Sequence, residues 1–345
     1  MQAIKNLLVC GAILFGTLTV SAQEELLKLG LEARVDYLRQ TIDGDHIGDE
    51  SGFKGRFVNL IINGNLGHGV SYAYRHRLNK INKDNTFFDA IDWLYLSYTS
   101  PNNRWTLSGG KQVVGVGGYE YDIAPIDAYF YSEFCSTIGC YQFGVSVTHT
   151  LKSGNDSFMA QVTQSPFRAE HAKEMYAYNL MWMGRHGRLS TLYSLNAMEH
   201  APGEYIYYIA LGNRLNLGRV TLELDLTNRA TEHQAFLFRD CSVMGKVAVE
   251  TCDYVQLQAK ASYDVNRTSH LGDYCVQPDS ELTRLSAAVE VYPIKGKRHV
   301  RLHAAYSYTF GSCNETNILQ DKQSIINFGL TWRMNLLSFT PNKRK

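Results

Sequence analysis

The chain has 345 residues, of which 45% are hydrophobic and 19% are charged. Its mean hydropathy is -0.24, so the apolar residues are dispersed among polar ones, which excludes transmembrane helices in the mature chain. The 34 Lys and Arg residues nearly balance the 33 Asp and Glu residues, which leaves no basic surface for a nucleic-acid partner. The 22 tyrosines, beside only 7 prolines, favour β-strands.

The only long apolar run lies at the N-terminus. Lys5 precedes apolar residues 7–20, and the small-residue sequence Val20-Ser21-Ala22 follows them. This pattern predicts a secretory signal peptide over residues 1–22, with the mature protein spanning residues 23–345. The alternative is a lipoprotein anchor at Cys10, but Cys10 lies inside the apolar run.

The mature chain repeats a segment of about ten residues in which apolar and polar side chains alternate. Residues 326–336 are the clearest example, with one apolar face and one polar face. A soluble β-sandwich would also alternate, but strands of this length, with aromatic residues near their ends, are typical of membrane barrels. The expected strands are residues 27–39, 56–65, 70–78, 89–98, 105–114, 142–150, 157–164, 175–183, 189–196, 205–215, 220–227, 241–249, 254–263, 282–292, 299–310 and 323–336.

We therefore predict an all-β fold, a transmembrane antiparallel up-and-down β-barrel of about 16 strands, with 14 or 18 strands as alternatives. An even count returns both ends of the chain to the periplasmic side. Short turns such as residues 67–69 and 216–218 are then periplasmic, and longer loops such as residues 42–55 and 311–322 face outside. A barrel of this size leaves room for an aqueous channel.

A long acidic and aromatic loop, residues 115–141, follows the fifth expected strand. Its glycines and Pro125 prevent regular strand pairing, and a loop of this length usually has a function. We expect the loop to fold into the lumen and set the narrowest cross-section of the pore. The residues expected in this constriction are Glu120, Asp122, Pro125, Asp127 and Glu133.

Basic side chains recur on the polar faces of the expected strands. The hypothesis is that they line the pore and face the acidic loop, so that a transverse electric field crosses the constriction. The alternative is that the charges neutralise one another between adjacent strands. Lys111 is ambiguous because a bulge at Gly109-Gly110 would change its face. The proposed pore-lining residues are Arg34, Arg75, Arg77, Lys111, Lys246, Lys260, Arg284, Arg301 and Arg333.

Three stretches of the sequence resemble a known family. They are GKQVVGVGGYEYDIAPIDAYFYSEF in residues 110–134, QSPF in residues 164–167 and NRA in residues 228–230. These stretches resemble the phosphate-selective porin O and P family of Gram-negative bacteria, particularly its Bacteroidetes-type members. The resemblance implies a 16-stranded outer-membrane barrel, usually a homotrimer in outer-membrane lipid, whose inward loops narrow a channel for small polar or anionic solutes such as phosphate. One departure is that this chain lacks the dense Arg and Lys lining of the phosphate-selective members.

Cysteines add a constraint, because six remain once the signal peptide is removed. In an oxidising compartment an even number suggests disulfides. Cys135 and Cys140 could close a small loop, and Cys275 and Cys313 lie in neighbouring outer loops and could pair. A metal site is the alternative, but no spacing typical of metal ligands supports one.

The sequence contains no familiar catalytic motif and indicates no cofactor. A dyad of His149 with Ser146 is unpromising because the two residues fall on opposite faces of their expected strand. We therefore expect a channel and not an enzyme. The alternatives are a structural or adhesive barrel with a plugged lumen, and an outer-membrane barrel enzyme.

Overall fold

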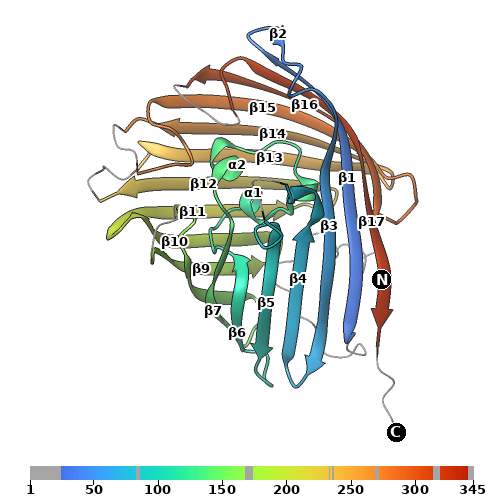
Figure 1. Cartoon of the computed structure of the whole chain (residues 1–345), viewed down its shortest axis with the longest axis vertical. Helices are drawn as coiled ribbons and strands as arrows, with labels where there is room; N and C mark the ends of the chain where they lie inside the picture. Colours follow the sequence, from blue (N-terminus) through green and yellow to red (C-terminus); the bar gives the residue numbers. More distant parts are fainter. Residues whose placement is uncertain are drawn as a thin grey trace.

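Almost all of the described chain belongs to one antiparallel sheet. The computed structural model describes residues 25–82, 86–167, 174–232, 234, 237–268, 272–313 and 319–340. Within these residues, seventeen strands form a single sheet that curves round into a barrel (Figure 1). The first nine strands are β1 (Leu27–Ile42), β2 (Asp45–His46), β3 (Gly52–Gly67), β4 (Val70–Arg77), β5 (Ile91–Thr99), β6 (Trp105–Val113), β7 (Tyr141–Thr150), β8 (Asp156–Gln164) and β9 (Tyr176–His186).

The second half of the chain contributes eight further strands, each longer than β4 to β9. They are β10 (Leu189–Ala201), β11 (Glu204–Asn216), β12 (Val220–Thr231), β13 (Asp240–Cys252), β14 (Val255–Asn266), β15 (Ser280–Val291), β16 (Val300–Ser312) and β17 (Gln323–Phe339). Neighbours in sequence pair with each other, and β1 pairs with β3 on one side and with β17 on the other, so the sheet has no free edge.

The predicted barrel is confirmed. Strand β2 has only two residues and pairs with the last two residues of β1, which leaves sixteen barrel strands in the described part of the chain. Each of the sixteen expected ranges overlaps one of them. Short and long connections alternate over most of the barrel, with β3 and β4 joined at residues 68–69 and β6 and β7 joined by residues 114–140. The predicted alternation fails between β10 and β11, where a long connection is expected and only residues 202–203 join the strands. The predicted signal peptide, residues 1–22, lies outside the described residues.

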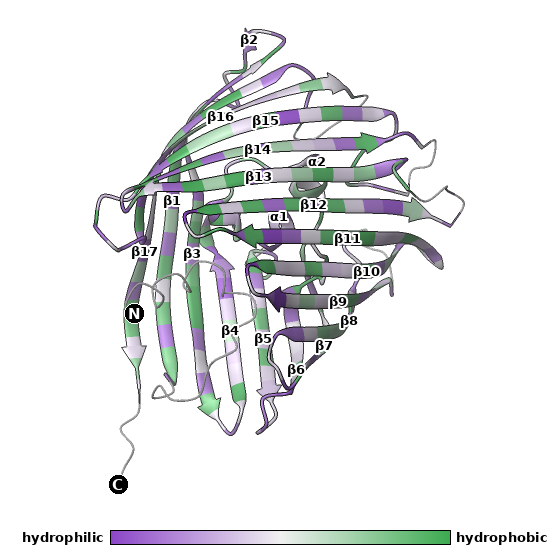
Figure 2. Cartoon of the chain, turned by 180° about the vertical axis from the view of Figure 1, so that it is seen from behind, coloured by the Kyte–Doolittle hydropathy of each residue, from purple (hydrophilic) through white to green (hydrophobic). Residues whose placement is uncertain are grey.

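The two faces of the barrel differ as the alternation predicts. Leu224 has 57% of its surface exposed, whereas its neighbour Asp225 has 5%, and Phe328 and Thr331 differ in the same way. In Figure 2, hydrophobic and hydrophilic residues alternate along the strands. The outward residues would face lipid, since exposed apolar residues on every second strand position suit a membrane and not water.

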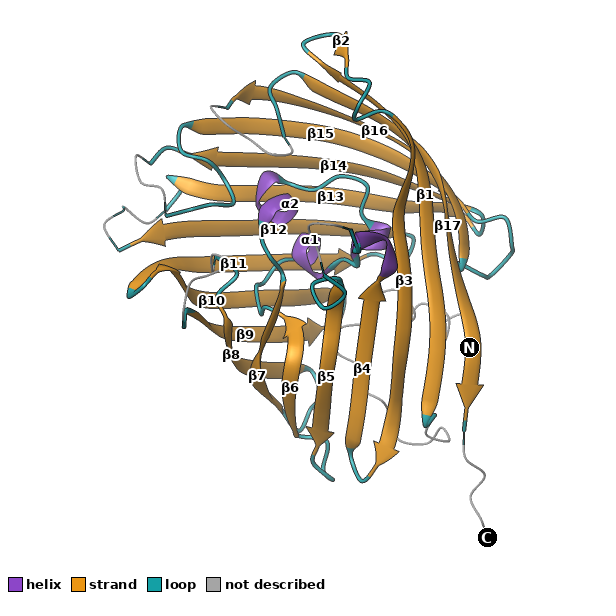
Figure 3. Cartoon of the chain, in the orientation of Figure 1, coloured by secondary structure: helices purple, strands orange, loops and turns teal. Residues whose placement is uncertain are grey.

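The connection between β6 and β7, residues 114–140, lies inside the barrel; we call it the lumen loop. It contains the short helices α1 (Tyr119–Asp122), η2 (Pro125–Asp127) and α2 (Glu133–Thr137). A further short helix, η1 (Leu78–Lys80), follows β4. Figure 3 shows α1 and α2 within the space that the strands surround. Among the described residues, no helix is long and apolar enough to cross a membrane.

Glycines let the lumen loop pass close to the wall at its first turn. Gly118 has a φ of 109°, which favours glycine. A Cβ on Gly212 of β11 would lie 2.6 Å from the Cα of Gly118, so position 212 has no room for a side chain. The motif that carries the family resemblance is therefore a backbone-to-backbone contact between the loop and the wall.

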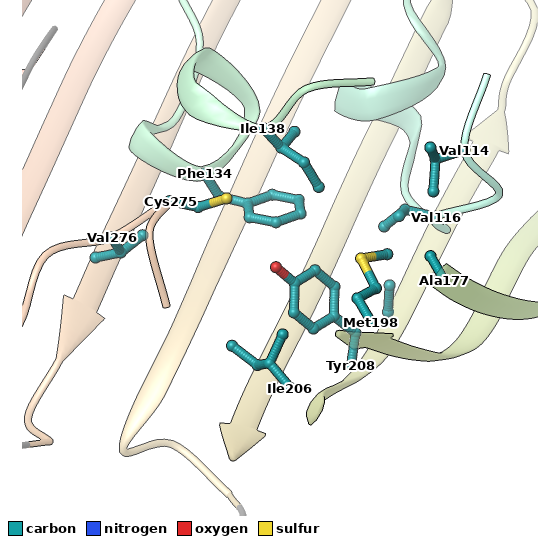
Figure 4. Packing of buried hydrophobic residues seen from close by; sticks show 11 residues of the cluster. Val114, Val116, Phe134, Ile138, Ala177, Met198, Ile206, Tyr208, Cys275 and Val276 are labelled. Carbon is teal, nitrogen blue, oxygen red and sulfur yellow. The ribbon is translucent and has the colours of Figure 1, made fainter. Parts of the chain in front are cut away.

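The far end of the lumen loop is held by an apolar cluster inside the barrel. Phe134 and Ile138, at α2, face Ile206 and Tyr208 of β11, and Cys275 and Val276 approach from the connection between β14 and β15 (Figure 4). Phe134 and Tyr208 meet edge to face, with ring centroids 5.6 Å apart. This contact fixes α2 against the wall.

Candidate channel constriction

The lumen loop is anchored to the wall through its backbone. The amide of Gly115 donates to Gln161 Oε1 of β8 at 2.7 Å, and the amide of Gly117 donates to Ser194 Oγ of β10 at 2.8 Å. Further along, the amide of Glu120 donates to Asp225 of β12 at 2.7 Å. Polar wall residues therefore replace the strand partners that this irregular segment lacks.

Two loop carboxylates pair directly with wall cations. Glu120 contacts Lys260 of β14, and Asp127 lies 2.9 Å from Arg301 of β16 and 2.6 Å from Arg333 of β17. Burial alone would raise the pKa of Asp127, but the two guanidinium groups outweigh it and lower that pKa. The same holds for the pKa of Glu120, where Lys260 and Ser132 outweigh burial. Both carboxylates are therefore charged.

Two further arginines bind backbone carbonyl groups of the loop. Arg34 of β1 donates to the carbonyl of Ala128 at 2.5 Å, and Arg284 of β15 donates to the carbonyl of Tyr131 at 3.1 Å. Arg34 is also paired with Asp36 at 2.7 Å. Lys246 approaches Glu223 on the neighbouring strand at 3.5 Å. These cations fasten the loop or neutralise wall carboxylates.

This arrangement changes the predicted transverse field. The prediction places wall cations and loop carboxylates on opposite sides of open water, whereas Glu120 and Asp127 touch their cations directly. Paired charges at contact distance cancel most of each other's field. The field at the passage must therefore come from other residues.

The open space lies on the side of the barrel that the loop leaves free. A cavity of about 510 Å3 separates the lumen loop from β3 to β7. Arg75 and Arg77 of β4 line it, and both bind the same carboxylate oxygen of Asp92, at 3.0 and 3.1 Å. Two guanidinium groups thus share one carboxylate, which leaves one positive charge in surplus on this wall.

Buried side chains support the arginines on this wall. Trp93 Nε1 and Arg77 Nε are buried and have no hydrogen-bond partner among the described residues, although both residues line the cavity. Arg75 is held rigidly, because its guanidinium lies 3.9 Å from the Trp93 ring centroid and donates to the Tyr141 hydroxyl at 2.5 Å. A wall with a surplus guanidinium charge suits a small anion.

Asp122 faces this wall from the loop. It lines the cavity, and neither an ion pair nor a side-chain hydrogen bond is found for it among the described residues. Burial raises the pKa of Asp122 to about 6, although Arg214 nearby opposes the rise. Pro125 begins η2 and lines the same cavity. Glu133, in contrast, is buried at the start of α2, away from the passage.

Lys111 requires a correction. Its position in β6 has the outward parity of Trp105 and Leu107, and the register with β5 and β7 shows no shift that would turn it inward. Its Nζ lies 5.9 Å from the ring centroid of outward-facing Phe143. Lys111 therefore departs from the inward parity of the other basic residues, although its side chain is among those that line the cavity.

The two predicted disulfides are absent from the structure, since Cys135, Cys140 and Cys275 are free thiols. Ile138 leaves α2 in an extended conformation, and the carbonyl of Cys140 already accepts from the amide of Val114, so the chain runs on toward β7 and does not turn back toward Cys135. Cys275 is buried in the apolar cluster, so it is not available for the predicted pairing with Cys313. Among the described residues, no group of side chains is arranged to hold a metal ion.

Sequence reasoning missed several residues of the site. Strict alternation of side chains along β5 would turn Asp92 outward, because its neighbour Trp93 faces inward. A register shift between β4 and β5 beside Arg75 instead brings Asp92 to Arg75 and Arg77. Arg56, whose Nε lies 3.9 Å from the Asp36 carboxylate on the lumen face of β1, is left over at a bulge between β1 and β3, so alternation does not assign its face. Arg214 could have been found, because it shares the parity of inward Tyr208. His149 packs on Trp105, and Ser146 bonds Gln112 on the other face, so the two form no dyad.

The fold is shared with outer-membrane channels of known structure. The anion-selective porin from Comamonas acidovorans has a TM-score of 0.63 at 13% identity, covering 90% of this chain and 100% of the porin. OmpT of Vibrio cholerae has a TM-score of 0.62 at 12% identity, covering 92% of this chain and 99% of OmpT. The outer-membrane channel DcaP of Acinetobacter baumannii has a TM-score of 0.63 at 10% identity, covering 89% of this chain and 96% of DcaP. No curated protein sequence matches the chain.

The sequence itself matches a family model. Residues 27–201, just over half of the chain, match phosphate-selective porin O and P. This match includes the lumen loop and the strands that carry Arg75, Arg77 and Asp92. Together with the closed barrel, the match shows that the chain belongs to the phosphate-selective porin O and P family and is an outer-membrane porin, a channel for passive diffusion.

Proposed function

We propose that small anions are the solutes that this porin admits preferentially. The observation that carries the proposal is the pair Arg75 and Arg77, which share the single carboxylate of Asp92 on the wall of the open cavity. The surplus charge of these two guanidinium groups attracts anions to this wall. The anion selectivity of the Comamonas acidovorans porin supports the proposal.

The preference should be modest and not restricted to phosphate. Asp122 offsets part of the surplus charge from the loop side, and most other lumen cations are already paired with carboxylates. Phosphate is one of the anions that such a wall accepts, alongside other small oxyanions. We also propose a homotrimer, supported by the trimer form of the Vibrio cholerae OmpT.

Reversal potentials in planar bilayers under a KCl gradient test the proposal. The wild-type channel should prefer chloride, and Arg77→Gln should lower the chloride-to-potassium permeability ratio by about fivefold, the effect of roughly 1 kcal/mol for one charge near the ion path. The control is Arg219→Gln, which removes the same charge from an exposed turn. A wild-type preference for potassium would refute the proposal, and folded barrels without any conductance would favour the plugged alternative.

A further inference from the structure

A buried charge cluster joins the lumen loop to a second segment inside the barrel. This segment, residues 272–276, lies between β14 and β15, and we call it the roof segment. Its Cys275 and Val276 pack against Phe134 and Ile138 of the lumen loop. The side-chain amide of Asn266 donates to the carbonyl of Val276 at 2.7 Å. The roof segment therefore covers α2.

Arg229 of β12 holds the roof segment by a shared contact. Its Nε lies 2.7 Å from Asp273 of the roof segment and 3.1 Å from Asp240 of β13. Asp273 also accepts from the amide of Cys275 at 2.7 Å. Two carboxyl groups thus converge on one N–H group in a site without solvent access, since Arg229 and Asp240 have no exposed surface.

The lumen loop contributes a carboxyl group of its own. Asp264 of β14 accepts from the amide of Glu133 at 3.0 Å and from the Ser242 hydroxyl at 2.5 Å. Ser242 in turn accepts from Arg229 at 3.1 Å. The Glu133 side chain accepts from the amide of Leu319, in the connection between β16 and β17, at 3.1 Å. One polar network therefore connects α2, the roof segment and the wall.

The charges in this network do not balance. Four carboxyl groups and two guanidinium groups take part, and none of the six side chains is more than 4% exposed: Glu133, Asp240, Asp264, Asp273, Arg229 and Arg284. Leaving two negative charges uncompensated in a buried site costs several kcal/mol, so carboxyl groups there bind protons instead. The docked arrangement is consequently a protonated one.

We propose that this network is a proton-operated latch, which holds the roof segment on the lumen loop at acid pH and releases it as the pH rises. Glu133 is the group that meets the others: Asp264 faces it from β14, Arg284 from β15 and Asp273 from the roof segment. Once Glu133 ionises, its negative charge repels Asp264 and Asp273, and only Arg284 and the amide of Leu319 oppose that repulsion. Release would expose Cys275 and the apolar cluster that it shares with Phe134.

The pKa of Glu133 supports release of the roof segment at higher pH. Burial, with the nearby charge of Asp264 as the second cause, raises the pKa of Glu133 to about 7. A raised pKa means that the docked state binds a proton that the released state gives up. Docking is therefore fully stable below the ordinary carboxyl range and is lost as the pH rises through about 7.

Labelling of native thiols tests the latch without measuring ion flow. Cys275 is 2% exposed in the docked state, whereas Cys252 is exposed in the turn between β13 and β14 and reports the intrinsic reactivity of a thiol. The protein is folded in detergent with its other cysteines replaced by serine, and both thiols are labelled with a maleimide. The Cys275-to-Cys252 rate ratio should rise about tenfold between about pH 5.5 and pH 8.5.

Glu133→Gln mimics the protonated side chain. The Cys275-to-Cys252 labelling ratio of this variant should therefore stay at the wild-type acid value at every pH. Asp122→Asn is the matched control, since it removes a carboxyl group from the same loop outside the network, and its profile should follow the wild type. A flat wild-type ratio, or an unchanged rise in Glu133→Gln, would overturn the latch. Should Glu133→Gln fail to fold, Asp273→Asn replaces it and must shift release to higher pH.

Discussion

Single residues in the passage are held in place before any ion arrives. Arg75 is fixed by the Trp93 ring, the Tyr141 hydroxyl and Asp92, so its guanidinium cannot turn away from the cavity. Charges that are already oriented need no reorganisation when an ion passes. The few charges that remain unpaired therefore determine the ion selectivity of the passage, and the carboxylate of Asp122 opposes the surplus arginine charge.

The protonation of Asp122 should make selectivity depend on pH. Burial raises the pKa of Asp122 to about 6, so the carboxylate loses its charge as the pH falls through that value. Wild-type reversal potentials should then shift toward anions below about pH 6, and Asp122→Asn should show the acid value throughout. One charge near the path changes the permeability ratio by about fivefold.

A matched measurement separates Asp122 from Glu133, whose pKa is also raised. Glu133→Gln should leave the pH shift in reversal potential in place, because Glu133 is buried behind the passage. The assignment to Asp122 is wrong if Asp122→Asn retains the wild-type shift.

Alternation in the sequence was enough to orient most residues, and it failed where strands are irregular. Arg301 and Thr331 follow the period of two and face inward as predicted. Asp92 and Arg56 lie beside register shifts, which depend on how two distant strands pair and leave no mark in local composition. The partner of the passage arginines was therefore beyond prediction from one sequence.

At the scale of elements, hydrogen bonds between Glu120 and Ser132 join two distant points of the lumen loop. The carboxylate of Glu120 accepts from the amide of Ser132 at 2.7 Å and from its hydroxyl at 2.6 Å. The residues between them, 121–131, form a lobe whose two ends already meet. The lobe contributes Tyr121, Asp122 and Tyr131 to the cavity wall.

Deletion of residues 121–131 should leave the barrel intact and widen the passage. Single-channel conductance should rise by about twofold or more, since ion flow increases with the open cross-section. Shortening the exposed connection at residues 43–51 serves as control and should leave conductance unchanged. Equal conductance in wild type and deletion would show that the lobe does not limit flow.

The existence of this loop was predictable, but its contacts were not. Pro125 and the glycines exclude a strand over residues 115–141, and length alone suggested a functional element. Which carboxylate meets which cation depends on the position of the loop across a barrel whose strands lie up to 206 residues away in sequence. The prediction of a transverse electric field across open water was therefore wrong. Loop carboxylates that touch the wall cations and loop carboxylates that stand apart from them have the same sequence pattern.

For the whole molecule, the outward face must match the membrane. Leu285 and Ser286 are neighbours near the middle of β15; Leu285 is 48% exposed outward, and Ser286 lines the lumen side. Leu285→Arg should lower the free energy of unfolding by about 2 to 4 kcal/mol, the cost of a charged side chain at the membrane midplane. Ser286→Arg should cost much less, as judged by denaturant unfolding in lipid bilayers. Equal losses would contradict the assignment of faces.

The long-range pairing of Asp127 with Arg333 also bears on how the porin is assembled. The lumen loop is synthesised before β14 to β17, yet its cations come from β14, β16 and β17. These contacts have high sequence separation and form late in folding. We therefore expect the lobe of the lumen loop to reach its final position only after β14 to β17 have joined the wall and β17 has closed on β1.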